Sequence, residues 1–263
     1  MISVVQLGTI DYATGLRLQQ KLIELRKADK VSDTLLLLEH TPVITLGRNA
    51  DQSNIIVPRE FLEQKGVELF ECDRGGDVTF HGPGQLVGYP IFDLRAQIGP
   101  DGQRKTVYPV DYVRRVEEAL IRTCADYGIL TERLNGMTGV WTVPGSSAGL
   151  SEQAKIAAIG VHISRAVTSH GFALNVNTDL DYFNLIVPCG IATKPVTSMQ
   201  RELGRDVAID EVAQAVLRNF GRVFNSQVLW VETLEALLGE SVGVPLKEPP
   251  ELRALWGDET SRA

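Results

Sequence analysis

One cysteine of the sequence, Cys189, is placed where a thiol could act as a nucleophile. It lies between Pro188 and Gly190, and a stiff residue followed by a permissive one is typical of a turn that displays a side chain to a ligand. Free cysteines are often only small buried hydrophobes, so an inert Cys189 is the alternative. The other two cysteines, Cys72 at the end of an expected strand and Cys124 on the apolar face of an expected helix, are predicted to be structural or uninvolved.

A lysine with suitable chemistry, Lys155, begins an apolar run that we expect to be a strand. Alternate residues of a strand share a face, so Lys155 would lie with apolar side chains, namely Ala157, Ile159, Val161 and Ile163. Burial among them favours the neutral amine, which can take and give protons near neutral pH. The opposite face of the strand is apolar too, so an exposed lysine at the start of the strand is the alternative.

A thiol and an amine together fit acyl transfer from a thioester. A thiolate attacks a thioester carbonyl readily, and a nearby ammonium group favours the thiolate. The acyl enzyme keeps the reactivity of a thioester, and a base must then remove a proton from an incoming amine. An amide is more stable than a thioester, so this chemistry needs no ATP. Backbone N–H groups near Gly190, or near Gly75 and Gly76, could bind the oxyanion.

Residues 74–85 form a glycine-rich segment that also contains an arginine and a histidine, and it follows an expected strand. Glycines let backbone N–H groups approach a ligand closely, so the segment suits the wall of a pocket for an acyl or phosphate-bearing group. Neither the phosphate-loop consensus nor the dinucleotide fingerprint is present. A tight hairpin turn with no binding role is the alternative.

The elements that must position these residues alternate between strands and helices. Hydrophobic periodicity predicts strands at residues 2–7, 34–38, 43–46, 67–71, 140–141, 156–163, 172–176 and 228–231. It predicts helices at residues 12–27, 58–64, 110–127 and 209–224. Residues 156–163 and 172–176 are expected to form a hairpin. The fold class is therefore mixed α/β, with strands too often consecutive for a strict βαβ array.

We expect a single catalytic domain at residues 1–243 and a flexible C-terminal tail at residues 244–263, where prolines are frequent and no apolar period remains. Residues 144–152 are rich in glycine and serine and are expected to form a flexible loop beside the site.

The composition excludes several classes of protein. With 263 residues and 44% hydrophobic residues, the chain can bury a substantial core, and its net charge of −7 argues against a nucleic-acid partner. Three widely spaced cysteines without a Cys-x-x-Cys pair argue against disulfides and structural zinc. We see no secretory signal and no apolar run near the roughly 20 residues that cross a bilayer. These features predict a cytoplasmic protein without a membrane association.

Five ordered segments of the sequence resemble the signature of the lipoyl(octanoyl) transferase family. The most informative of these segments is Arg74-Gly75-Gly76 with Thr79-Phe80-His81, Gly84-Gln85 and Tyr89. The others lie at residues 39–47, 155–161, 169–175 and 187–191. The resemblance spans about residues 2–224.

The resemblance implies an enzyme that transfers octanoyl from octanoyl-acyl carrier protein to a lysine of lipoyl domains, without a cofactor or metal. It implies a single domain with the catalytic fold of biotin and lipoate protein ligases. The implied acceptors are the E2 subunits of 2-oxoacid dehydrogenases and the glycine cleavage H protein. Cys189 corresponds to the acyl-thioester nucleophile and Lys155 to the catalytic lysine. The implied substrate-binding residues are Arg74, Gly75, Gly76, Asp77, Val78, Thr79, Phe80, His81, Ala158, Ile159, Gly160, Gly171, Phe172 and Ala173.

The four histidines are expected to differ in role. His81 and His170 lie in matched segments and could orient a carbonyl group or the substrate lysine. We expect His162 to face solvent and His40 only to brace a turn.

Three other functions remain as alternatives. An ATP-dependent lipoate or biotin protein ligase would share the fold and the lysine, but needs a nucleotide site and no cysteine. A noncatalytic module that binds acyl carrier protein would have no use for Cys189. A hydrolase could combine Cys189, His170 and Asn175, although the spacing matches no hydrolase signature that we recognise.

Overall fold

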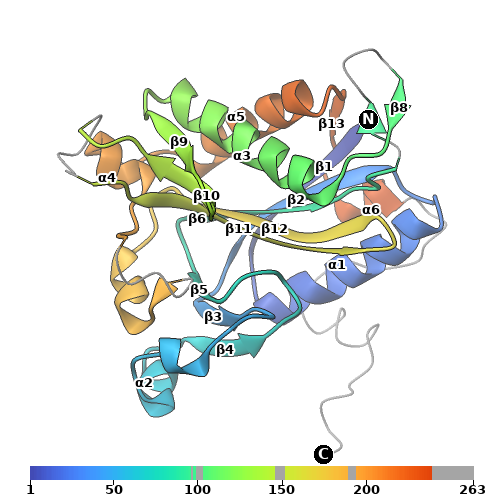
Figure 1. Cartoon of the computed structure of the whole chain (residues 1–263). Coiled ribbons are helices and arrows are strands. Elements are labelled where there is room, and N and C mark those ends of the chain that lie inside the picture. The colour runs from blue at the N-terminus through green and yellow to red at the C-terminus, as the bar shows by residue number, and fades with distance from the viewer. Residues whose placement is uncertain (96, 99–102, 146–151, 189–193, 239–263) are drawn as a thin grey trace, which may run out of the picture.

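The computed structural model describes residues 1–95, 97–98, 103–145, 152–188 and 194–238 (Figure 1). Within these residues an eight-stranded sheet has the order β13-β1-β2-β6-β12-β11-β10-β9. Its strands, in chain order, are β1 (Ile2–Ile10), β2 (Asp33–His40), β6 (Gln85–Ile91), β9 (Thr131–Leu134), β10 (Met137–Thr142), β11 (Lys155–Ser164), β12 (Val167–Asn175) and β13 (Val228–Trp230).

The sheet is mixed. Strand β1 runs parallel to both β2 and β13, whereas the pairs from β2 to β9 are antiparallel. The hairpin of β11 and β12 turns at Arg165 and Ala166, which both have positive φ. The chain can therefore pass from β11 to β12 in two residues, and this places residues near 160 beside residues near 171.

Helices cover both faces of the sheet (Figure 1). Helices α3 (Pro109–Asp126) and α5 (Ile209–Val223) lie on one face, over a core that includes Leu120 and Phe220. Helix α1 (Tyr12–Lys27) lies on the other face, over the cluster that contains Leu22 and Leu36. The Asp11 carboxylate caps α1 by accepting a hydrogen bond of 2.7 Å from the Thr14 N–H.

A smaller sheet of order β4-β3-β5 lies on the same side of the large sheet as α1 (Figure 1). Its strands are β3 (Val43–Leu46), β4 (Glu68–Glu71) and β5 (Val78–His81). Its core, which includes Ile44 and Phe80, packs against the 3₁₀ helix η2 (Leu180–Leu185). The remaining short elements are η1 (Gln52–Asn54), α2 (Arg59–Gln64), the pair β7 (Gln97–Ile98) and β8 (Arg104–Lys105), α4 (Met199–Leu203) and α6 (Leu234–Leu238).

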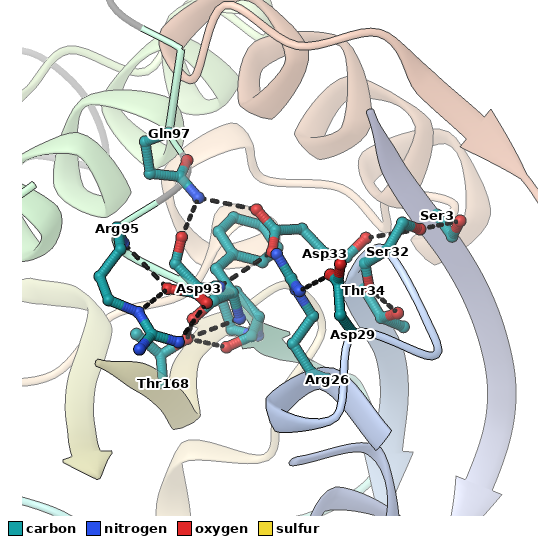
Figure 2. Close-up of polar contacts among 12 residues, drawn as sticks. Ser3, Arg26, Asp29, Ser32, Asp33, Thr34, Asp93, Arg95, Gln97 and Thr168 are labelled. Carbon is teal, nitrogen blue, oxygen red and sulfur yellow. Dashed lines mark hydrogen bonds and ion pairs between the residues drawn. The ribbon is translucent and has the colours of Figure 1, made fainter. Parts of the chain in front are cut away.

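A polar cluster joins α1, β2 and the loop after β6 at one end of the large sheet (Figure 2). Asp33 is at its centre and accepts hydrogen bonds from Arg26 Nε (2.8 Å) and the Asp93 N–H (2.9 Å) through Oδ1. Its Oδ2 accepts a hydrogen bond of 2.7 Å from Gln97 Nε2. One carboxylate thus links three segments that are distant in sequence.

The mixed α/β class and most predicted elements are confirmed. The helix predicted at 12–27 and the strand predicted at 43–46 have the expected bounds. The second strand of the predicted hairpin is longer than expected, because it begins at Val167 rather than at 172. The added residues include Ser169, His170 and Gly171, which do not show the alternation of apolar and polar residues that predicts a strand. All nine residues of β12 are nevertheless buried. The predicted tail lies outside the described residues.

Among the residues that the structure describes, no helix combines the length and apolar character needed to span a bilayer.

Candidate active site

A narrow hollow of about 50 Å³, here called the first hollow, lies between the glycine-rich segment and the centre of the large sheet. It is lined by all but two of the predicted substrate-binding residues, namely Arg74, Gly75, Gly76, Asp77, Thr79, His81, Ala158, Ile159, Gly160, Gly171, Phe172 and Ala173. Its other lining residues are Tyr12, Val87, Tyr89 and His170. The structure thus brings together in one cavity wall residues from three of the five matched segments and from α1.

Two predicted residues, Val78 and Phe80, do not line this hollow. Both are buried in the core of the small sheet, where Phe80 stacks on Tyr182 with ring centroids 4.6 Å apart. Alternate residues of β5 point to opposite sides, so Thr79 and His81 face the hollow while their neighbours face the core.

The glycine-rich segment is fixed to the large sheet by close backbone contact. The Gly75 N–H donates a hydrogen bond of 3.1 Å to the Val161 carbonyl of β11. A Cβ atom on Gly160 would lie 2.6 Å from the Gly75 carbonyl oxygen, so a side chain there would force the two segments apart. The absence of a side chain at Gly160 therefore lets the segment form a wall rather than a loose turn.

The buried guanidinium of Arg74 organises this wall. It donates to Thr45 Oγ1 (3.0 Å from Nε) and to the carbonyl oxygens of Thr45 and Asp77 (2.6 Å each from Nη2). Within the described chain no carboxylate bonds to this guanidinium, so its positive charge is balanced only by neutral acceptors. Such a charge beside a hollow stabilises negative charge that develops there.

Beneath the hollow, His40 is buried and neutral. Its Nδ1 lies 3.0 Å from the Ile10 carbonyl, which can only accept, so Nδ1 carries the proton and Nε2 accepts from the Tyr89 hydroxyl at 2.6 Å. Burial lowers the pKa of His40 to about 4, although the hydrogen bond to the Ile10 carbonyl acts to raise it. The prediction that His40 only braces a turn is wrong, because its ring also fixes the hydroxyl of a tyrosine that lines the hollow.

The ring of His81 is held at the end of a chain of amides. The Asn175 amide donates to the Thr197 carbonyl (2.9 Å), and Gln85 Nε2 donates to Asn175 Oδ1 (2.9 Å). Gln85 Oε1 therefore accepts from Nδ1 of His81, at 2.7 Å. Burial, with the nearby His40 and Arg74, lowers the pKa of His81 to about 3. His81 thus stays neutral, and its Nε2 is left as a hydrogen-bond acceptor at the hollow.

His170 is oriented by Asp73 at the rim of the hollow. Its Nε2 lies 2.7 Å from Asp73 Oδ1, and burial lowers its pKa although this bond opposes the change. His162, which we expected to face solvent, is half-buried and lies 3.7 Å from the other oxygen of Asp73. Asn175 bonds to Gln85 and Thr197 rather than to His170, so the arrangement of a Cys-His-Asn hydrolase is not formed.

Lys155 is buried, so the alternative of an exposed lysine is wrong. Its Nζ lies 4.8 Å from the centroid of the Trp141 ring, a cation–π contact. A Cβ atom on Gly139 would lie 2.7 Å from the Ala157 carbonyl oxygen, so this glycine lets β10 and β11 approach closely. The ring of Trp141, also in β10, contacts the lysine amine directly.

The predicted nucleophile, Cys189, lies outside the described residues, but the residues on both sides of it are placed. The Val187 N–H donates a hydrogen bond of 2.7 Å to the Asn54 carbonyl. On the other side of the cysteine, the Lys155 N–H donates to the Pro195 carbonyl and the Thr197 N–H donates to the Lys155 carbonyl, both at 2.9 Å. The chain that carries Cys189 is thus hydrogen-bonded directly to the backbone of Lys155.

Lys155 and Pro188 also line one small cavity, here called the junction, together with Thr79, Gln85, Ala158, Ala173, Asn175, Phe183 and Val196. The junction shares Thr79, Ala158 and Ala173 with the first hollow. An acyl chain in the first hollow would therefore extend towards the lysine and the residue that precedes Cys189.

The other two cysteines occupy different surroundings. Cys124 is fully buried on α3, and burial raises the pKa of its thiol to about 12, so it stays protonated. Cys72 is half-buried beside the Leu46 carbonyl. Among the described residues no cluster of side chains could hold a metal ion.

Several residues of the site were not predicted. Gln85 and Tyr89 belong to the quoted motif, so their signal was present in the sequence. Tyr12 follows the helix cap Asp11 and stacks on His81 at 6.1 Å, which nothing in the local sequence indicates.

Residues 11–221 match the family of lipoyl protein ligase A/B catalytic domains. The chain belongs to this family. It is 60% identical over 259 residues to a protein of Koribacter versatilis named octanoyltransferase, with 98% of each chain covered. It is 56% identical to a protein of the same name from Acidobacterium capsulatum, over 91% of this chain and 97% of that one.

Solved structures of lipoate protein ligases have the same fold. A bipartite lipoate protein ligase from Thermoplasma acidophilum superposes with a TM-score of 0.67 at 18% identity, covering 90% of this chain and 89% of that one. A lipoate-protein ligase A bound with ATP gives a TM-score of 0.66 at 18% identity, covering 100% and 97%. The predicted catalytic fold of lipoate ligases is therefore confirmed.

Proposed function

We propose that this protein transfers an octanoyl group from octanoyl-acyl carrier protein to a lysine of a lipoyl domain, through a thioester on Cys189. The observation that carries the proposal is the junction, where buried Lys155 and Pro188 meet at the end of the first hollow. The names of the relatives indicate the same acyl group.

In the first half of the reaction the Cys189 thiolate attacks the thioester carbonyl. The bond between this carbonyl and the donor sulfur breaks, and Lys155 as an ammonium group protonates the departing thiolate. Cys189 then carries the octanoyl group. The uncompensated charge of Arg74 and the backbone N–H groups of the glycine-rich segment favour the negative charge of the intermediate.

In the second half a neutral lysine amine of the acceptor attacks the acyl enzyme. The amide bond forms, the bond to the Cys189 sulfur breaks, and Lys155 takes the proton that the amine loses. This step restores both the thiolate and the ammonium group. The energy of the thioester drives the sequence, so no nucleotide takes part.

The first hollow would hold the hydrocarbon chain against apolar side chains, which include Val87, Ile159 and Phe172.

The implied acceptors are the lipoyl domains of 2-oxoacid dehydrogenase E2 subunits and the glycine cleavage H protein.

A free nucleophilic thiol is kept reduced in the cytoplasm, where we place the reaction.

The test is incubation with octanoyl-acyl carrier protein, followed by intact and peptide mass spectrometry. We expect one octanoyl adduct on Cys189 that hydroxylamine removes, and Cys189→Ser should abolish it. Transfer to a lipoyl domain should proceed without ATP and Mg²⁺. An adduct on Cys72 or Cys124, or modification that requires free octanoate and ATP, would contradict the proposal and favour a ligase.

A further inference from the structure

A third cavity, here called the outer groove, continues from the junction on the side away from the first hollow. It has a volume of about 440 Å³ and is lined by Ile56, Leu180, Asp181, Phe183, Asn184, Ile186, Val187, Pro188, Lys194, Pro195, Val196 and Arg201. It shares Phe183, Pro188 and Val196 with the junction. The three cavities therefore form a series with Lys155 in the middle member.

The lining of the outer groove is amphipathic. Most of its side chains are apolar, and the polar ones include Asn184, which makes no side-chain hydrogen bond within the described chain. A volume of this size lies in the range of small-molecule sites, which runs from about 300 to 1,000 Å³. Such a lining fits a slender ligand that alternates amide groups with short hydrocarbon segments.

The charges of the groove favour a ligand with an anionic end. The lining contains two cations, Lys194 and Arg201, and a single carboxylate, that of Asp181. Lys194 donates to Gln153 Oε1 at 2.9 Å, whereas the exposed Arg201 guanidinium has no acidic partner among the placed residues. One cation of the groove is thus available to a phosphate.

We propose that the outer groove binds the 4′-phosphopantetheine arm of the acyl donor, with Arg201 and Lys194 at its phosphate. The inference rests on the proposed function, because it needs a carrier-bound thioester whose carbonyl reaches the junction. The arm would then lie on one side of Lys155 and the acyl chain on the other. Its two amides would meet Asn184 and the backbone of the groove, and its phosphate would lie at the outer end.

The test is to replace Arg201 by glutamine and to measure the first half-reaction with two small donors, octanoyl-4′-phosphopantetheine and octanoyl-pantetheine. The parent protein should show the lower KM for the phosphorylated donor. Arg201→Gln should raise this KM about fivefold, the effect of one solvent-exposed ionic contact, and should reduce the difference between the donors by the same factor. Raising the salt concentration should weaken the preference of the parent more than that of the variant.

The matched control is Arg205→Gln. Arg205 is also exposed and lies just after α4, the helix that contains Arg201, but it does not line the groove. It should keep the KM values of the parent for both donors. Lys194→Met should act in the same direction as Arg201→Gln.

Transfer from preformed acyl enzyme to a lipoyl domain should change less than twofold in Arg201→Gln. Three results for Arg201→Gln would each overturn the phosphate assignment. The first is an equal rise in KM for both small donors, and the second is a rise in KM seen only with the complete acyl carrier protein. The third is a loss of rate in transfer to the lipoyl domain that equals the loss in the first half-reaction. Failure of the proposed function is distinguishable, because the parent would then form no acyl enzyme with any donor.

Discussion

The Lys155 side chain contacts an aromatic ring of the neighbouring strand. The centroid of the Trp141 ring lies 4.8 Å from Lys155 Nζ, and Gly139 lets the two strands approach closely at this point. The indole is itself fixed, because its Nε1 donates to the Met137 carbonyl at 3.2 Å. The ring quadrupole attracts a cation over the aromatic face, so Trp141 holds the lysine amine in place.

At the residue scale we predict that Lys155→Arg separates the two halves of the reaction. Arginine keeps the positive charge that favours the thiolate, but it cannot act as a base because it does not lose its proton in proteins. Acyl enzyme should therefore accumulate, and its transfer to the lipoyl domain should slow by a factor on the order of 100 to 10,000. Single-turnover quench experiments with mass detection measure both steps.

Two further variants complete this experiment. Lys155→Ala should slow both halves, and the exposed Lys30→Arg should change neither. Transfer at the parental rate in Lys155→Arg would remove Lys155 from the mechanism.

At the scale of elements, the site depends on contacts that sequence periodicity does not encode. The strand of Lys155 and the glycine-rich segment were both predicted, but their contact through Gly75 and Gly160 joins residues that are distant in the chain. The start of β12 was missed because Thr168, Ser169 and His170 are polar, and their burial is explained only by neighbours such as Gln19, whose side chain accepts from the His170 N–H at 2.6 Å. Local patterns therefore identified most of the longer elements, and the resemblance to the transferase family indicated most lining residues. The role of His40 and the contribution of Tyr12 required the tertiary structure.

The polar cluster around Asp33 provides a prediction at this scale (Figure 2). In Asp33→Asn the new amide N–H₂ would face the Gln97 donor or the Arg26 guanidinium, so at least one hydrogen bond must be lost. Arg26 and Asp33 have side chains only 9% and 13% exposed, and breaking such a pair should lower the free energy of unfolding by about 2 to 3 kcal/mol. Urea unfolding followed by circular dichroism measures this change.

Asp29→Asn is the control, because Asp29 also bonds to Arg26 but its side chain is 92% exposed. Its loss should cost less than about 1 kcal/mol. A similar loss of unfolding free energy in Asp33→Asn and Asp29→Asn would show that the hydrogen bonds from Asp33 to Asp93 and Gln97 do not stabilise the protein.

At the scale of the whole molecule, the buried histidines make stability depend on pH. His40 and His81 have pKa values lowered to about 4 and about 3 by burial, whereas an unfolded chain has histidine pKa values near 6.5. The unfolded state therefore binds more protons below pH 6.5, and stability falls as the pH drops from there towards 4. Each histidine contributes a slope of about 1.4 kcal/mol per pH unit in this window.

Urea titrations between pH 7 and pH 4.5 should show this loss, and stability above pH 7 should not depend on these two groups. In His40→Gln the slope should fall by the contribution of one histidine, about 1.4 kcal/mol per pH unit. A slope that is unchanged in this variant would mean that His40 is protonated in the folded protein.

The pairing of β1 with both β2 and β13 has a consequence for how the chain folds. Ile2 pairs with Asp33, which is close in sequence, but also with Val228, which the ribosome adds long after both of the other residues. Until then β1, whose first four residues are buried in the finished sheet, presents an open edge to other chains. Contacts of such long sequence separation form slowly, so the nascent protein passes through a period in which aggregation competes with closure of the sheet.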